Sequence, residues 1–325
     1  MKRFVMILMI LTILLTSCVG QAGQNGPSTE NSPMGGDQGD QNDPSNNMPP
    51  PNETKAPASV EDMTEIESVL AVSKLTEFCT TNEVAYKVEF EVDGLKRYVE
   101  IALPKDYQKK AYPCVLYFPD VGYGADFLVS QFAKKDVIVV RLFGRGSKGN
   151  EGIKDFCGED FADAEEVLSI CKACPFLSDG GIFTAGAVDG ATYALKLAAE
   201  HPNDVAGCAV VDAVCDYEAI METQGENTKS MFLYALGCTE EQLPEELAKR
   251  SPKGFCQDIR VPVLMFCYSD TPLVPKEHSE ELKALLDNAG CETELHYLSP
   301  LSSDFNGTAL TKLFPWIKNI LKELK

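Results

Sequence analysis

Five consecutive residues, Gly186-Ala187-Val188-Asp189-Gly190, have the spacing of a turn that presents a nucleophile. They lie within GIFTAGAVDGA, an apolar run that leads through glycines into a small-residue helix start. A G-x-x-x-G turn between a buried strand and a helix holds its middle residue on a sharp bend, exposed for attack on a substrate. The middle residue here is Val188, which has no lone pair. The sequence predicts the turn without a nucleophile at its usual position.

Alternating strands and helices are predicted around this turn. Short apolar runs between Gly, Pro and Asn indicate buried strands, and apolar residues at helical spacing indicate helices. This alternation is typical of a mostly parallel, doubly wound sheet, and residues 216–251 are predicted as a helical insertion. The predicted strands are 84–92, 96–103, 114–118, 137–142, 182–187, 205–211, 261–268 and 292–298. The predicted helices are 60–70, 161–171, 276–288 and 308–324, besides the one that follows the turn to about residue 200.

Three further segments carry a family resemblance. Phe143–Gly152, FGRGSKGNEG, is similar to an R-G-x-G-x-S-x-G loop after a fourth strand. Ser251-Pro252 with Ile259–Leu264 is similar to an S-P…I-x-V-P-V-L approach to a seventh strand, and Leu273–Ser279 to a D-x-L-V-P…H-S helix start. In this order the chain resembles the α/β-hydrolase superfamily, most closely its prolyl-oligopeptidase-like and dienelactone-hydrolase-like branches. The resemblance covers Tyr86 to the C-terminus and implies an α/β-hydrolase fold.

The resemblance also implies where a catalytic triad would stand. The nucleophile position is Val188, and the acid position, three residues before the valine of the Val-Pro pair, is Thr271. Aligning the last strand and Phe305 with the family's histidine loop places Ser303 where the general base belongs. The chain has only three histidines, and none lies in that loop. Since a triad works as a unit, three changed positions predict a degenerate site with no intact catalytic residue.

Four aspartates are predicted near the C-terminal ends of strands, and they allow two alternative interpretations of this edge of the sheet. Asp189 is a candidate for a shifted nucleophile, although that mechanism also needs a histidine and Asp189 suits the first turn of a helix. The second alternative is a site for a cationic ligand, because ligands of open α/β sheets bind at the ends of the strands. Turn formation or helix capping would explain the same residues. The candidate ligand-binding residues are Asp120, Asp189, Asp270 and Asp304.

The N-terminal residues predict export and a lipid anchor. Lys2 and Arg3 precede an apolar run that is too short to span a bilayer, which is typical of a signal peptide. Leu15-Thr16-Ser17-Cys18 resembles the lipobox of bacterial lipoproteins and implies lipidation of Cys18. The next residues are rich in Gly, Asn, Gln, Pro and Ser and predict a disordered tether. The expected organisation is 1–17 signal peptide, 18–59 lipidated cysteine and tether, and 60–325 folded domain.

Charge and cysteine content limit the partners. The formal net charge of −20 predicts repulsion of nucleic acid and of anionic lipid surfaces. Cys114, Cys208 and Cys267 fall in predicted buried strands, where a thiol packs as a small hydrophobic group. Cys171 and Cys174 form a lone C-x-x-C without the second ligand pair that zinc needs. No metal or cofactor is therefore expected.

These observations predict an extracytoplasmic, membrane-anchored lipoprotein with a catalytically inactive hydrolase-like domain that binds or scaffolds. A peptide, an envelope glycan or a cationic molecule is the expected ligand. The alternative is an active esterase or peptidase that uses non-standard residues. A purely structural role as a spacer or complex subunit is also left open.

Overall fold

The computed structural model describes residues 69–74, 83–107, 109–119, 135–173, 177–269, 273–298 and 309–324. The chain divides into two units, Met1–Ala56 and Pro57–Lys325, and all described residues belong to the second. The predicted signal peptide and tether, with Cys18, lie outside the described residues. Among the described helices, none is long and apolar enough to cross a membrane.

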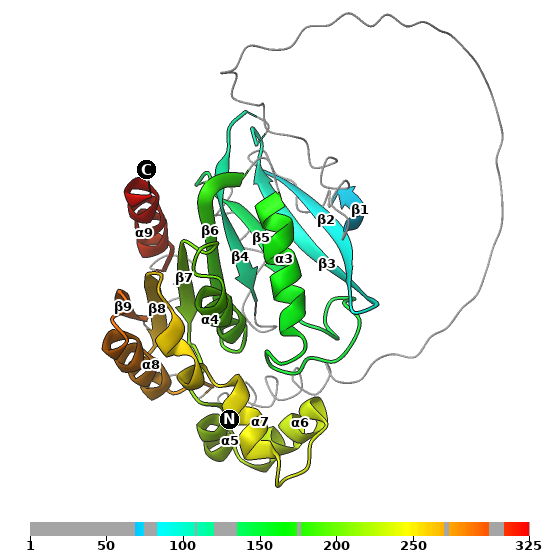
Figure 1. Cartoon of the computed structure of the whole chain (residues 1–325), viewed down its shortest axis with the longest axis vertical. Helices are drawn as coiled ribbons and strands as arrows, with labels where there is room; N and C mark the ends of the chain where they lie inside the picture. Colours follow the sequence, from blue (N-terminus) through cyan, green and yellow to red (C-terminus); the bar gives the residue numbers. More distant parts are fainter. Residues whose placement is uncertain are drawn as a thin grey trace, which may run out of the picture. The chain divides into compact units, whose positions relative to one another are not determined.

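The described strands form one mixed sheet, in the order β1-β2-β3-β5-β4-β6-β7-β8-β9 (Figure 1). From β5 onward neighbouring strands are parallel, whereas β1, β2 and β3 are joined to it in antiparallel fashion. The predicted mostly parallel sheet is confirmed. The strands are β1 Val69–Lys74, β2 Glu83–Val92, β3 Leu95–Pro104, β4 Tyr112–Phe118, β5 Ile138–Leu142, β6 Leu177–Ala187, β7 Gly207–Val211, β8 Val263–Tyr268 and β9 Thr293–Leu298.

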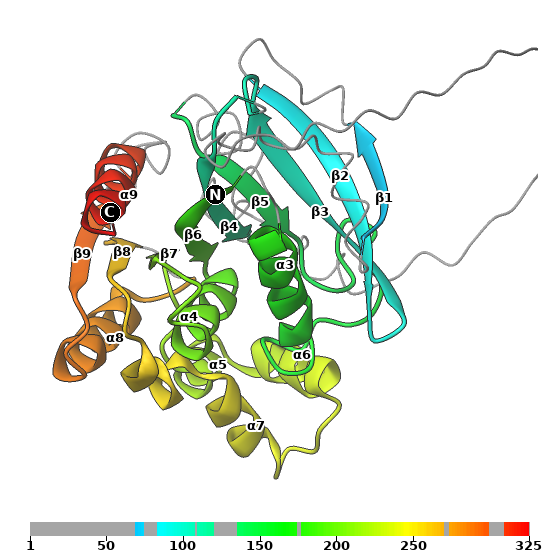
Figure 2. The same cartoon turned by 45° about the horizontal axis from the view of Figure 1, so that its top comes forward.

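Helices cover both faces of the sheet, which is why its central strands are mostly apolar (Figures 1 and 2). In β4, Cys114, Leu116 and Phe118 pack on one face with α3 Phe161–Ala173, α4 Gly190–Glu200 and α8 Lys276–Asn288. Their neighbours Val115 and Tyr117 point to the other face and pack with α9 Leu310–Glu323. Side chains that alternate between the two faces of one strand thus contribute to two separate hydrophobic cores.

The turn between β2 and β3 follows directly from its sequence. Asp93 and Gly94 both have positive φ, 54° and 72°. That is the requirement of a type I′ turn, for which Asp-Gly is a preferred pair. The predicted hairpin is therefore confirmed.

The predicted helical insertion is also confirmed. It consists of α5 Tyr217–Gln224, α6 Glu226–Leu236 and α7 Leu243–Arg250, between β7 and β8. Its apolar residues form a third cluster around Phe156, Tyr217 and Phe232, whose rings meet edge to face at centroid distances of 5.0–5.9 Å.

The predicted helix over 60–70 is wrong at its end, because Val69 already lies in strand β1. Pairing with β2 along most of its length determines this conformation, and such a long-range contact is invisible in a local amphipathic pattern. The three cysteines predicted to be core residues, Cys114, Cys208 and Cys267, are fully buried. Each described cysteine is a free thiol.

Candidate functional site

The turn after β6 keeps the backbone geometry of a nucleophile-bearing bend. Val188 has φ of 55°, in the left-handed region, where a β-branched residue is a genuine outlier. Its N–H donates to the Val211 carbonyl at 2.9 Å, which ties the bend to the end of β7. Such strain costs about 1–3 kcal/mol and persists only where the surrounding structure imposes it. The bend is therefore imposed by the packing of β6 and α4, and Val188 conforms to it.

The two glycines of the motif explain that packing. A Cβ added at Gly186 would lie 2.2 Å from the Gly190 carbonyl oxygen. One added at Gly190 would lie 2.2 Å from the carbonyl oxygen of Phe118, the last residue of β4. Only glycine allows β6, α4 and β4 to approach this closely, so the motif survives on structural grounds.

Gly190→Ala is expected to lower the free energy of unfolding by about 2–3 kcal/mol, because backbone rather than a flexible side chain must move. Gly254→Ala is the matched control, since its added Cβ would meet nothing closer than 3.4 Å. Urea denaturation of both variants measures the difference. Equal effects would show that the crowding at Gly190 does not constrain the turn.

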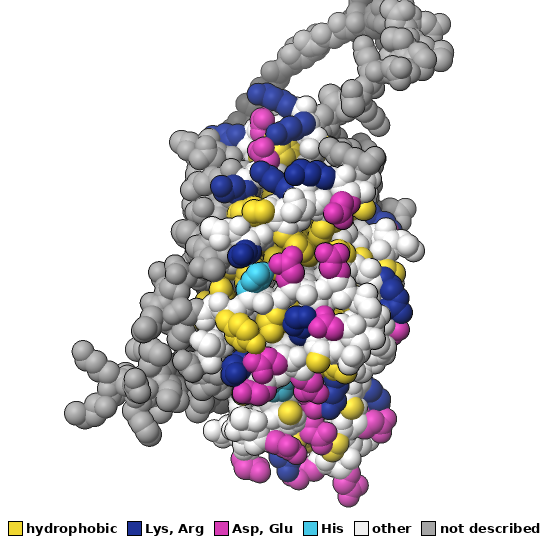
Figure 3. All heavy atoms as spheres, turned by 90° about the vertical axis from the view of Figure 1, so that its left-hand side faces the viewer, with side chains coloured by type: hydrophobic (Ala, Val, Ile, Leu, Met, Phe, Trp, Pro, Cys, Tyr) yellow, Lys and Arg dark blue, Asp and Glu magenta, His cyan; other side chains and the backbone are white. Residues whose placement is uncertain are grey.

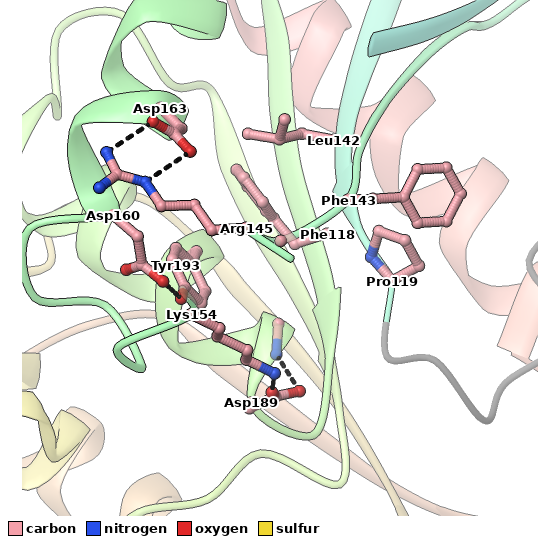
Figure 4. Close-up of a pocket in the computed structure, with 12 residues that line it drawn as sticks. Phe118, Pro119, Leu142, Phe143, Arg145, Lys154, Asp160, Asp163, Asp189 and Tyr193 are labelled. Atoms are coloured by element: carbon pink, nitrogen blue, oxygen red, sulfur yellow. Dashed lines mark hydrogen bonds and ion pairs between the residues drawn. The ribbon is translucent and has the colours of Figure 1, made fainter. Parts of the chain in front are cut away.

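Among the described residues around the bend, Val188 is apolar and Asp189 and Lys154 are already paired with each other (Figure 4). Half-buried Val188 packs against the aromatic cluster of the insertion. Asp189 is the N-cap of α4, and its carboxylate accepts the Gly190 N–H at 2.9 Å. The same carboxylate forms an ion pair with the Lys154 ammonium, which also lies 4.9 Å from the centroid of the Phe156 ring. The positive end of α4, where an oxyanion would be stabilised, is thus occupied by a carboxylate.

All three histidines are described, and a ring nitrogen of each lies within hydrogen-bonding distance of another residue. His201 ends α4, with Nε2 3.1 Å from a carboxylate oxygen of Glu165. His296 lies in β9, with Nε2 3.0 Å from Glu294. His278 is buried in the first turn of α8, and its Nδ1 accepts the Cys215 N–H at 3.3 Å. Burial lowers the pKa of His278, which favours the neutral ring.

Beside the bend lies a small cavity of about 30 Å³ (Figure 4). Its described part has room for a water molecule or two. The charged and aromatic side chains around it come from the ends of β4 and β5 and from the starts of α3 and α4. They are Phe118, Phe143, Arg145, Lys154, Asp160, Asp163, Asp189 and Tyr193.

Asp160 is the unusual acid of this cavity. Burial, together with a hydrogen bond to the Asp155 carboxylate and that group's charge, raises the pKa of Asp160 to about 7. Its oxygens accept the Cys157 N–H at 2.9 Å, the Asp155 N–H at 3.0 Å and the Tyr193 hydroxyl at 2.5 Å. Asp160 therefore changes charge near neutral pH, beneath the helix that carries the turn.

Two buried arginines share one carboxylate at the other side of the cavity. The Asp163 carboxylate accepts Arg97 Nε at 2.6 Å and receives Arg145 through two bonds, of 3.1 and 2.8 Å. These contacts connect strand β3, the loop after β5 and helix α3. The Arg145 loop is part of the segment on which the family resemblance rests, and in the structure its role is to anchor α3.

The predicted site residues divide into two groups. Val188 and Asp189 lie together at the turn, as their sequence neighbourhood requires. The remaining predicted positions lie outside the described residues and stay predictions: Asp120, Asp270, Thr271, Ser303, Asp304 and Cys18. Lys154, Asp160 and Tyr193 were not predicted, because nothing in the local sequence shows that they line one cavity.

The sheet order, the turn between β6 and α4 and the insertion after β7 define an α/β-hydrolase fold. Comparison with known proteins agrees. The acetyl xylan esterase from Paenibacillus sp. R4 superposes with a TM-score of 0.63 at 14% identity, covering 78% of this chain and 91% of that one. The acylaminoacyl peptidase of Pyrococcus horikoshii gives a TM-score of 0.58 at 13% identity, covering 76% of this chain and 42% of that one.

In sequence, the chain is 27% identical over 199 residues to YtmA, an uncharacterized peptidase of Bacillus subtilis (strain 168). This match covers 59% of the chain and 76% of the relative. No family model matches the chain. The likeness to solved structures, at such low identity, shows the fold alone.

Proposed function

We propose that this chain is a hydrolase-fold protein that binds a ligand at the edge of the sheet near the turn and does not hydrolyse it. The observation that carries the proposal is Val188, held in the strained nucleophile conformation with an apolar side chain packed against the insertion. The geometry of the turn is explained by Gly186 and Gly190 without any catalytic demand.

The chemistry around Val188 supports the same proposal. Acyl transfer by this fold needs a nucleophile, a histidine to move its proton and a preorganised oxyanion site. Each histidine of the chain has another partner, and none lies in the loop after β9. A tetrahedral oxyanion near the start of α4 would meet the Asp189 carboxylate. That carboxylate has a cation already, the ammonium of Lys154, so an amine-bearing ligand would have to displace it.

The second candidate is an active esterase or peptidase that uses other residues. It is favoured by the names of the relatives, an acetyl xylan esterase, an acylaminoacyl peptidase and an uncharacterized peptidase. Asp160, with its raised pKa, is the described group closest to the requirements of a general acid or base in such a reaction.

Turnover assays separate the two candidates. We expect the full chain to release product from aryl acetates and aminoacyl anilides no faster than a heat-inactivated sample. Rates above that background, if lost in Asp160→Asn but kept in Asp258→Asn, would establish the hydrolase. Asp258 is a suitable control because it lies outside the cavity, in the short helix after α7.

We further propose that the mature chain starts at lipidated Cys18 and is held on the extracytoplasmic face of a membrane, where its ligand is a peptide or an envelope glycan. The lipobox-like Leu15–Cys18 supports this proposal. Cys18→Ser is then expected to abolish incorporation of radiolabelled fatty acid into the protein. Unchanged labelling would contradict lipidation at Cys18.

A further inference from the structure

Six exposed lysines gather at one end of the sheet, beside the N-terminal ends of the parallel strands. We call them the basic pole: Lys105, Lys109, Lys110, Lys135, Lys318 and Lys322. Figure 3 shows lysine and arginine side chains concentrated toward this end, whereas acidic side chains dominate the opposite end, where the insertion lies. The net charge of −20 is therefore unevenly distributed.

Contacts between three segments bring these lysines together. Lys110, before β4, lies 3.2 Å from the carboxylate of Asp136, before β5. Lys135, next to Asp136, lies 6.0 Å from the centroid of the Phe314 ring in α9. The end of α9 reaches the start of β6, where Leu324 is 3.8 Å from the position of a Cβ on Gly180. The turn after β3, the start of β5 and α9 thus form one surface.

The basic pole keeps an excess of positive charge, although Asp106, Asp136 and Glu323 lie beside its lysines. Within the described part of the chain, no carboxylate lies within 4.0 Å of the ammonium of Lys105, Lys109, Lys135, Lys318 or Lys322. The lysines of the insertion and of α8 differ, because each has a close acidic partner. These pairs are Lys229–Glu240 at 2.6 Å, Lys249–Glu246 at 2.8 Å, Lys276–Glu280 at 3.2 Å and Lys283–Asp287 at 2.6 Å.

We infer that the basic pole docks on an anionic lipid membrane, although the net charge of the whole chain alone predicts repulsion from such a surface. Salt screens charges beyond about 8–10 Å, so a docked surface responds to nearby lysines and not to acidic groups at the far end. Lysines near an anionic bilayer contribute about 1 kcal/mol each. The described residues of 105–110, 135–136 and 318–324 include no arginine and no exposed aromatic side chain of the kind that reads or stacks on nucleic acid bases. A lipid attached to Cys18 would hold the chain at a membrane and so bring this surface close to it.

The inference also orients the proposed ligand site. The turn at Val188 lies at the C-terminal ends of the parallel strands, at the edge opposite the basic pole (Figure 1). With the basic pole on the membrane, the turn and the insertion face away from it, toward ligands in the surrounding space. The docking claim stands independently of whether the site binds or hydrolyses.

Vesicle co-sedimentation tests the inference. The full chain carrying Cys18→Ser, so that no lipid is attached, is mixed with vesicles of phosphatidylcholine alone or with an equal part of phosphatidylglycerol. We expect preference for the anionic vesicles, weakening as salt rises. Lys109→Ala/Lys135→Ala/Lys318→Ala should weaken binding about 100-fold, or roughly fivefold per lysine. The control Lys229→Ala/Lys249→Ala/Lys276→Ala removes the same charge from the acidic end and should not weaken it.

Three results would overturn the inference. The first is equal binding to neutral and anionic vesicles, which would assign binding to the apolar N-terminal run. The second is an equal loss in the control variant. The third is lysine-dependent binding to duplex DNA without binding to anionic vesicles. Unchanged thermal unfolding of both variants ensures that a loss reflects the surface and not the fold.

Discussion

Asp163→Asn is expected to lower the free energy of unfolding by about 3–5 kcal/mol, the usual cost of breaking a buried ion pair from one side. The side chain of Asp163 is 4% exposed and those of Arg97 and Arg145 are 0% and 8% exposed. Asparagine keeps the shape but removes the one charge that both guanidinium groups share at hydrogen-bonding distance. Two buried cations would then face each other with a neutral amide between them.

Urea denaturation measures this loss, with Glu245→Gln as the matched control. Glu245 also pairs with a cation, Lys249 at 2.9 Å, but its side chain is 74% exposed. An exposed pair of this kind contributes at most about 1 kcal/mol. A similar small effect for both variants would mean that Asp163 does not hold the loop after β5 to helix α3.

The free energy of unfolding is expected to fall as pH rises from about 4 to 7, through Asp160. The usual pKa of the side chain is 3.8, and in the folded protein burial and then Asp155 raise it to about 7. Between these values the folded state holds a proton that the unfolded state has released. Stability then decreases with rising pH, by up to about 1.4 kcal/mol per pH unit, and levels off above pH 7.

Asp160→Asn isolates this contribution, because asparagine cannot ionise. The difference in unfolding free energy between the variant and the wild-type protein should move in favour of the variant from pH 4 to 7 and then stay constant. Titration of carboxylates that do not contact Asp160 cancels in the difference, whereas that of Asp155, its hydrogen-bond partner, does not. A constant difference across that range would show that Asp160 ionises normally and would remove it as a candidate acid or base.

Local sequence signals predicted much of the fold. Helix α8 has the predicted bounds, Lys276–Asn288, because its apolar residues keep strict helical spacing. The hairpin turn at Asp93-Gly94 was predictable because its chemistry is local. Strand β1 was not, since its conformation depends on pairing with β2 and a charged amphipathic stretch precedes it directly.

The site was only partly predictable, for a related reason. Val188 could be placed from the glycines beside it. The ion pair between Lys154 and Asp189 joins residues far apart in the sequence, and nothing near either one predicts it. The raised pKa of Asp160 depends on its burial and on Asp155, which no spacing reveals. Thr271 and Ser303 stay predictions of the family resemblance.

Mass spectrometry of the intact protein after treatment with a fluorophosphonate tests the central claim most directly. This reagent adds covalently to a serine that a neighbouring base activates. We predict no adduct on the full chain, and none on Val188→Ser, because no histidine lies in position to activate the new hydroxyl. A serine esterase treated in parallel confirms that the reagent is active. A stoichiometric adduct on the wild-type chain, mapped to a residue at the C-terminal ends of the strands, would contradict the account and establish an active hydrolase.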